Sequence, residues 1–444
     1  MVSGITTMPA GNANLSTDLS DDHPISFLYS AALAAADGEL VNPAVLPGPV
    51  RLENGKVQCI SCHDPHTNLF TDFLVISSEN SSLCMACHQK NLWTTSTHRT
   101  STAIWSGSGI DPWPHTSYST VSQNGCENCH NPHTAVGKPR LLNSLIEENN
   151  CMNCHNGNVA TTNIQVQLTK AYVHDVVAYL GVHDPVETTL ASTYHVECVD
   201  CHNPHASNAG TANAPLANGF IAGVMGIDQN GNAVTQISFE YELCYRCHTS
   251  SPGMASPAVS RQIVQNNVRL EFATTNPSFH PVVGPRNKTD VPSLIFPWTS
   301  SSVMYCTDCH ASDGSSSPDG PHGSIYPHIL KLQYQMGSNV QESAAAYALC
   351  YSCHSRTSIL NDVSFERHHL HIVDEHTPCI TCHDAHGISS MQGNSLNNSN
   401  LINFRLGSGG PTPWNNLLKY EDLGTYHGQC YMRCHGEDHD PFTY

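Results

Sequence analysis

The chain has 444 residues, with 18 basic and 37 acidic side chains and a formal charge of −19. This excludes a protein that binds nucleic acid through a basic surface. Only 12 % of the residues are charged, about half the usual share, whereas 20 cysteines and 29 histidines far exceed ordinary usage. Because hydrophobic residues make up 39 % and Gly and Pro number 30 and 27, we expect no large hydrocarbon core.

The apolar stretches are too short to cross a membrane. The longest, Phe27 to Ala36 and Gly219 to Ile227, are about half of the ~20 residues that a membrane helix needs. The N-terminus, MVSGITTMPAGNANLSTDLSDD, has neither the basic nor the apolar region of a signal peptide. We interpret it as a mature end from which any export signal has been removed, and we predict no membrane span.

Every cysteine belongs to a pair, and a histidine directly follows each pair. Nine pairs have the pattern CxxCH and begin at residues 59, 84, 126, 151, 198, 244, 306, 350 and 379, and a tenth, CYMRCH, begins at 430. This pattern attaches c-type haem, because two thiols form thioethers with the porphyrin and the adjacent imidazole binds the iron. Disulfides and zinc sites are the alternatives, but neither needs a histidine directly after the second cysteine.

The predicted cofactors are therefore ten covalently attached c-type haems, which replace the missing apolar core. The predicted thioether positions are Cys59, Cys62, Cys84, Cys87, Cys126, Cys129, Cys151, Cys154, Cys198, Cys201, Cys244, Cys247, Cys306, Cys309, Cys350, Cys353, Cys379, Cys382, Cys430 and Cys434. The predicted proximal iron ligands are His63, His88, His130, His155, His202, His248, His310, His354, His383 and His435.

The motifs form five doublets, and the first motif of a doublet offers a second histidine. In four doublets this second histidine comes three residues after the motif histidine: His66 in CHDPH, His133 in CHNPH, His205 in CHNPH and His386 in CHDAH. In the fourth doublet His322, in GPHG, takes this role. Proline in the connection holds the second imidazole away from the first iron, so we expect it to bind a neighbouring iron. A solvated loop histidine is the alternative.

The segments between doublets supply the remaining distal ligands. The candidates are His98 or His115, then His174, His183 or His195, then His280, then His368, His369, His371 or His376. We favour His115, His183, His280 and His371, whose neighbouring residues look restrained. Because ten motifs have only nine gaps between them, the tenth ligand comes from a terminus or from a gap used twice, and His23 and His439 are the terminal candidates. We include His23.

We predict mostly loops and short helices with few strands, wrapped around a continuous chain of ten haems. Short helices are expected before the second motif of a doublet, as in ISFEYELCYRCH and ESAAAYALCYSCH. The nominal haem-pair modules cover residues 1–100, 101–172, 173–265, 266–362 and 363–444. Thioether formation needs reduced thiols and an exported chain, which predicts a periplasmic, cell-surface or extracellular protein.

The sequence resembles multihaem cytochromes with doubled CxxCH motifs from metal-reducing prokaryotes. The resemblance rests on DLSDDHPISF around His23, CISCHDPH, NGCENCHNPH, HVECVDCHNPH, SFHPVVG, CTDCH followed by GPHGS, and CYMRCHG. Some members of this group form extracellular filaments. The resemblance therefore implies a head-to-tail homopolymer in which His23 binds a haem of the adjacent subunit, and a secreted protein.

The predicted function is long-range extracellular electron transfer rather than enzymatic catalysis. Other cytochromes, minerals or electrodes are the expected partners, with no nucleic acid and no membrane. The alternatives are a monomeric periplasmic or surface shuttle or metal reductase, the haem subunit of an outer-membrane conduit, and an enzyme that reduces a small oxyanion. Surplus histidines argue against the enzyme, because it needs an iron with an open position.

Overall fold

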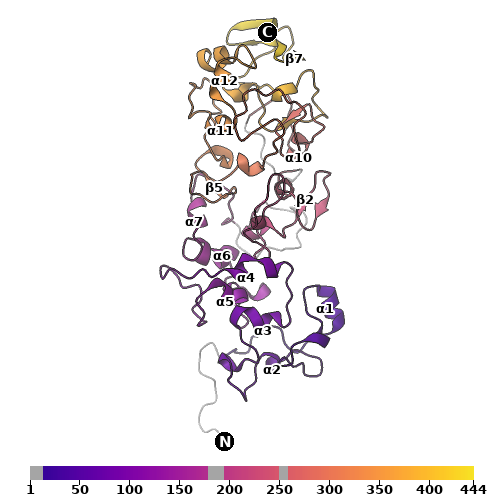
Figure 1. Cartoon of the computed structure of the whole chain (residues 1–444), viewed down its shortest axis with the longest axis vertical. Helices are drawn as coiled ribbons and strands as arrows, with labels where there is room; N and C mark the ends of the chain where they lie inside the picture. Colours follow the sequence, from indigo (N-terminus) through magenta and orange to yellow (C-terminus); the bar gives the residue numbers. More distant parts are fainter. Residues whose placement is uncertain (1–13, 179–194, 250–258) are drawn as a thin grey trace.

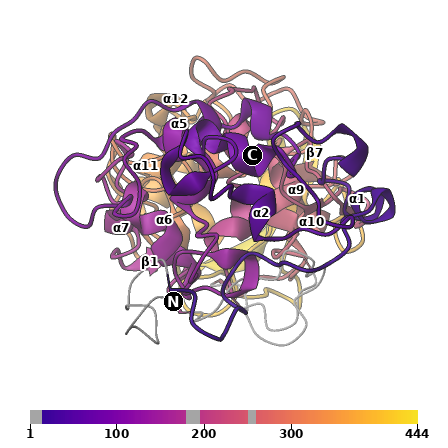
Figure 2. The same ribbon diagram turned by 90° about the horizontal axis from the view of Figure 1, so that it is seen from below.

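The computed structural model describes residues 14–178, 195–249 and 259–444. These segments form an elongated molecule, in which α2 and α3 lie near one end and β7 and the C-terminus lie at the other (Figure 1). In the view along the long axis, elements from the two ends overlap (Figure 2). From one end of the molecule to the other, the elements broadly follow the order of the sequence (Figure 1).

The helices are short because Gly, Pro and the attachment motifs interrupt them. Among the described residues the longest α-helix, α6, has nine residues. The α-helices are α1 (Ala31–Asp37), α2 (Cys59–Cys62), α3 (Ser82–Met85), α4 (Thr97–Thr100), α5 (Val121–Asn124), α6 (Glu147–His155), α7 (Ile164–Gln167), α8 (Cys198–Cys201), α9 (Glu240–Tyr245), α10 (Val268–Glu271), α11 (Ala348–Tyr351) and α12 (Arg356–Leu360).

The strands are few and all pair in antiparallel fashion. Three two-residue pairs join β1 to β5, β2 to β3 and β4 to β6, and a meander joins β7, β8 and β9. Their bounds are β1 (Tyr172–Val173), β2 (Gly226–Ile227), β3 (Ala233–Val234), β4 (Ser278–Phe279), β5 (Gly323–Ser324), β6 (Gly387–Ile388), β7 (Lys419–Gly424), β8 (His427–Cys434) and β9 (Glu437–Thr443).

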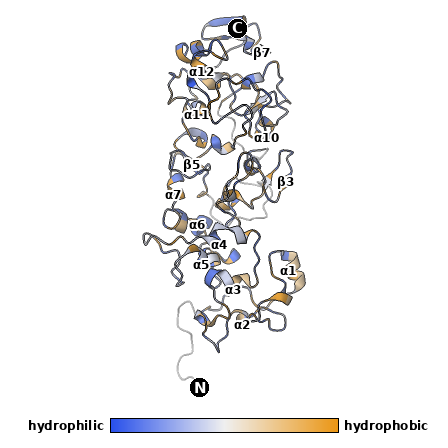
Figure 3. Cartoon of the chain, viewed as in Figure 1, coloured by the Kyte–Doolittle hydropathy of each residue, from blue (hydrophilic) through white to orange (hydrophobic). Residues whose placement is uncertain are grey.

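The apolar core is divided into small clusters. The four clusters among the described residues are centred on Tyr347, Tyr245, Tyr29 and Phe404. Each includes attachment cysteines among the residues packed against it. Hydrophobic residues are accordingly scattered along the molecule rather than gathered in one layer (Figure 3). The prediction of loops, short helices and few strands without a layered core is confirmed.

Two local expectations need correction. The run ISFEYEL forms α9 as predicted, but in ESAAAYAL the α-helix begins only at Ala348, after a series of turns. The C-terminal meander β7–β9 was not expected, and it places the tenth motif on a strand. The three residues between Cys430 and Cys434 suit a strand, because residues four apart lie on the same face.

Candidate haem-binding sites

The attachment motifs, numbered here as sites 1 to 10 in chain order, share one local geometry. None of the twenty cysteines forms a disulfide. In eight motifs the backbone N–H of the histidine donates to the carbonyl of the first cysteine at 2.9–3.0 Å, closing a helical turn. Site 4 lies within α6, and site 10 lies on β8. The turn holds two thiols and one imidazole together, as thioether attachment requires.

The histidines of the odd-numbered sites are oriented by the same hydrogen bond. Each ring places Nδ1 2.7–2.9 Å from a backbone carbonyl in a one-turn 3-10 helix that follows the motif. Since Nδ1 donates to this carbonyl, Nε2 is left as the metal-binding nitrogen. The pairs are His63 with Asp72, His130 with Arg140, His202 with Phe220, His310 with His328, and His383 with Asn400.

A second imidazole faces the motif histidine at nine of the ten sites. The ring centres lie 6.0–6.4 Å apart, and a metal bonded at about 2 Å to a nitrogen of each ring holds two imidazole centres about 6 Å apart. The residues therefore fit an iron between them. The facing pairs are His63–His133, His88–His23, His130–His205, His155–His98, His202–His322, His248–His174, His310–His386, His383–His368 and His435–His439.

At site 8 the link between the motif histidine and a second imidazole is electrostatic. Burial and the neighbouring His280 lower the pKa of His354 to about 4. The His354 ring contacts the hydroxyl of Ser293 at 2.9 Å through Nδ1, and His280 donates through Nδ1 to the carbonyl of Ala385 at 2.5 Å. His280, a predicted ligand, is thus near enough to His354 to interact with it electrostatically.

Burial keeps these imidazoles in the form that binds metals. It is the largest cause that lowers the pKa of His155, His205 and His248 to about 4. At neutral pH the three rings are therefore uncharged, and only the neutral imidazole offers a lone pair to a metal.

The second histidines of four doublets lie opposite a motif histidine of the preceding doublet. His133, His205, His322 and His386 face the odd-site histidine one doublet earlier, so the prediction that they reach a neighbouring iron fits the geometry. His66 is different. No doublet precedes it, its side chain is exposed, and its ring faces no motif histidine within the described ranges.

Of the favoured gap histidines, His115 faces no motif histidine among the described residues, and the prediction for His183 is not tested. His115 is exposed, and His98 faces His155 instead, because its Nδ1 donates to the carbonyl of Pro204 at 3.0 Å and fixes the ring. His183 lies outside the described residues, and His174 faces His248.

The fourth gap supplies two rings rather than one. His368 faces His383 at 6.4 Å, although the sequence favoured His371. His371 lies 5.2 Å from His435, whereas His439 lies 6.2 Å from the same ring. Both nitrogens of His439 are buried without a hydrogen-bond partner, which leaves either one available to a metal. Site 10 therefore has two candidates, of which His439 has the spacing seen at the other sites.

The ten motifs are arranged in space in the order of the sequence, each next to the following one. Between doublets, first cysteines lie within hydrogen-bonding reach: Cys84 and Cys126, Cys151 and Cys198, Cys244 and Cys306, and Cys350 and Cys379. Within doublets, second cysteines are close enough to interact electrostatically: Cys62 and Cys87, Cys129 and Cys154, Cys201 and Cys247, Cys309 and Cys353, and Cys382 and Cys434. Each motif is thus close to the next one in the sequence, through a thiol pair within hydrogen-bonding reach between doublets and through an electrostatic interaction within each doublet.

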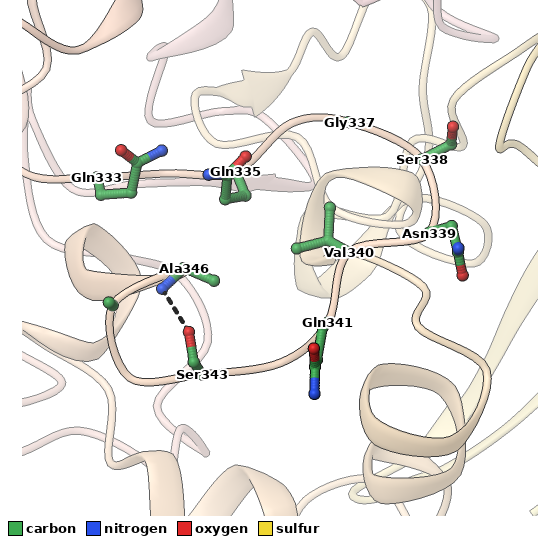
Figure 4. A pocket seen from close by; sticks show the side chains of 10 residues that line it. Gln333, Gln335, Gly337, Ser338, Asn339, Val340, Gln341, Ser343 and Ala346 are labelled. Carbon is green, nitrogen blue, oxygen red and sulfur yellow. Dashed lines mark hydrogen bonds between the residues drawn. The ribbon is translucent and has the colours of Figure 1, made fainter.

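A surface hollow lies beside site 8, and its lining residue Ala346 belongs to the apolar cluster that packs against Cys350. It encloses about 600 Å³ and is lined by residues of the segment from Gln333 to Ala346, where Ser343 accepts a hydrogen bond from the N–H of Ala346 (Figure 4). None of its ten lining residues is titratable, so it offers no acid, base or metal ligand. Within the described segments no helix has the length and apolarity to span a membrane.

The motifs, the facing imidazoles and the thiol contacts define a multihaem c-type cytochrome. Residues 118–280 match the family model of outer membrane cytochrome MtrC/MtrF-like domains II/IV, and residues 51–92 and 300–358 match the doubled CXXCH motif. Neither a curated protein nor a solved structure gives a significant match. The chain is thus a multihaem cytochrome with covalently bound c-type haem.

Proposed function

We propose that this protein binds ten c-type haems, each between two histidines, and conducts electrons along its length outside the cell as the subunit of an end-to-end filament. Haem supplies reversible one-electron oxidation and reduction. Where two imidazoles hold one haem iron, they would fill both of its axial positions, which would favour electron transfer over substrate binding. The matched multihaem families, one of them named for outer membrane cytochromes, support extracellular electron transfer and a cell-surface or secreted location.

The observation that carries this proposal is that every motif has an attachment cysteine close enough to interact with a cysteine of the next motif. Each thiol fixes one edge of a porphyrin, so contacts such as Cys84 with Cys126 bring neighbouring porphyrin edges close together. Electron transfer needs such proximity and a fixed geometry, and the chain supplies both through short turns and hydrogen-bonded imidazoles.

The ends of the molecule support assembly into a filament. Site 1 begins on α2 near one end, and site 10 lies on β8 in the meander with β7 at the other (Figure 1). A head-to-tail contact between copies would continue the file of sites and leave an open polymer. His23 faces His88 of its own chain, so the proposal does not use it as the bridging ligand. Near that end, the exposed His66 just beyond α2 faces no motif histidine within the described ranges.

A second candidate is a discrete surface cytochrome. The match to MtrC/MtrF-like outer membrane cytochromes over residues 118–280 favours it, since that family is named for its membrane location. Such a protein would act as a monomeric shuttle, as a metal reductase or as one subunit of a conduit.

Electron microscopy of the native extracellular fraction, combined with haem quantification per polypeptide, separates these candidates. Filaments of uniform width with ten low-spin haems per chain support the proposal. Discrete particles with ten haems support the surface cytochrome, and co-purification of a membrane partner supports the conduit. A high-spin iron or a lower haem count contradicts saturation of all ten sites.

A further inference from the structure

The second imidazoles differ in the group that accepts the hydrogen bond from Nδ1, the nitrogen that does not face the motif histidine. At sites 2 and 4, His23 and His98 donate through Nδ1 to neutral backbone carbonyls at 3.1 and 3.0 Å. At sites 1 and 7 the acceptor is a carboxylate instead. His133 lies 3.0 Å from Oδ1 of Asp22, and His386 lies 2.9 Å from Oε2 of Glu271.

The Asp22 carboxylate is buried against the His133 ring. Its side chain is 5 % exposed, and Oδ1 also accepts a hydrogen bond from the N–H of Thr134 at 3.2 Å. Oδ2 is buried without a hydrogen-bond partner, and within the described ranges His133 is the only basic side chain in ion-pair contact with Asp22. The charge of Asp22 is therefore directed at the His133 ring.

Glu271 holds His386 in a similar way. Its side chain is 11 % exposed at the end of α10, and the adjacent Phe272 packs on the His386 ring with centres 5.1 Å apart. The nearby guanidinium of Arg261 pairs with Asp384 at 3.3 Å and bonds to backbone carbonyls, so its charge is shared. Glu271 thus also directs negative charge at a second imidazole.

We propose that Asp22 and Glu271 are positioning residues that give sites 1 and 7 lower reduction potentials than sites whose second histidine donates to a carbonyl. A carboxylate that accepts the Nδ1 proton shifts electron density toward Nε2 and makes the imidazole a stronger donor to iron. A stronger donor stabilises ferric over ferrous iron, which lowers the potential. The inference rests on the proposed binding of haem between paired histidines.

The test is a spectroelectrochemical titration of the haem-loaded D22N variant. The substitution keeps an oxygen that can accept the hydrogen bond but removes the charge. About a tenth of the haem absorbance, from the low-potential end of the titration, should move to higher potential. The matched control is D21N, which removes the same charge from the adjacent residue without contact to His133.

The E271Q variant repeats the test at a separate site, so a folding defect in D22N does not prevent a decision. E271Q should move another tenth of the absorbance, and the double variant about two tenths. An unchanged titration in both D22N and E271Q overturns the inference, and so does an equal shift in D21N and D22N. In either case the proposed function still holds if the unmodified protein contains ten low-spin haems. Fewer than ten low-spin haems in the unmodified protein overturns both.

Discussion

The imidazole of His205 lies parallel to that of His130, with an interplanar angle of 7° and 6.2 Å between ring centres. His322 and His202 are also parallel at 7°, whereas His98 and His155 meet at 72°. The orientation of two axial imidazoles decides how an iron's d orbitals split. Parallel rings split them strongly and give rhombic low-spin spectra, whereas perpendicular rings leave them nearly equal in energy and give one large g value.

The first prediction is that the EPR spectrum of the oxidised protein contains both classes, and that single variants remove one class at a time. H205A should convert about a tenth of the irons to high spin at the expense of the rhombic signal. H98A should do so at the expense of the large-g signal. Identical losses in the two variants would contradict the ring geometry.

The second prediction concerns site 10, where two rings approach His435. The ring centre of His439 lies 6.2 Å from that of His435, which is the spacing of the other sites, whereas the ring centre of His371 lies only 5.2 Å away. We therefore expect H439A to produce about a tenth of high-spin iron and H371A to leave all irons low spin. The opposite pattern in the EPR spectra would assign the iron to His371.

The local part of the sites could be predicted from the sequence, because the chemistry is confined to a few consecutive residues. The motif brings its thiols and imidazole together whatever surrounds it, and CHNPH sets His133 and His205 at a fixed distance from their own motifs. The rings of those two histidines face motif histidines of a neighbouring doublet, which fits the prediction that they bind a neighbouring iron.

The long-range part could not be predicted, because it depends on contacts between distant segments. His98, and not His115, faces His155, because the ring of His98 is fixed by a hydrogen bond to the carbonyl of Pro204, more than a hundred residues away. His368 and His371 are three residues apart, and only the packing around them decides that the first faces His383. The carboxylates of Asp22 and Glu271 contact their histidines across more than a hundred residues as well, and no local pattern marks them.

The third prediction concerns assembly. If copies join end to end with His66 at the contact, H66A should shorten or abolish filaments seen by electron microscopy, while the ten irons of each chain remain low spin. The matched control is H115A, because His115 is also exposed and also faces no motif histidine in the described part of the chain. Filaments of normal length in H66A would exclude this residue as the bridge without excluding polymerisation itself.

The fourth prediction is that the polypeptide does not fold without haem attachment. The four apolar clusters are small, and the residues packed against them include attachment cysteines, such as Cys350 and Cys379 in one and Cys430 and Cys434 in another. Without porphyrins the apolar surface that these clusters bury is too small to offset the conformational entropy of 444 residues, most of which lie in loops. Protein produced without the haem-attachment machinery should therefore show no cooperative thermal transition by circular dichroism and poorly dispersed NMR spectra. Haem-loaded protein from the same sequence is the control, and a cooperative transition in both would mean that the side chains alone suffice to hold the fold.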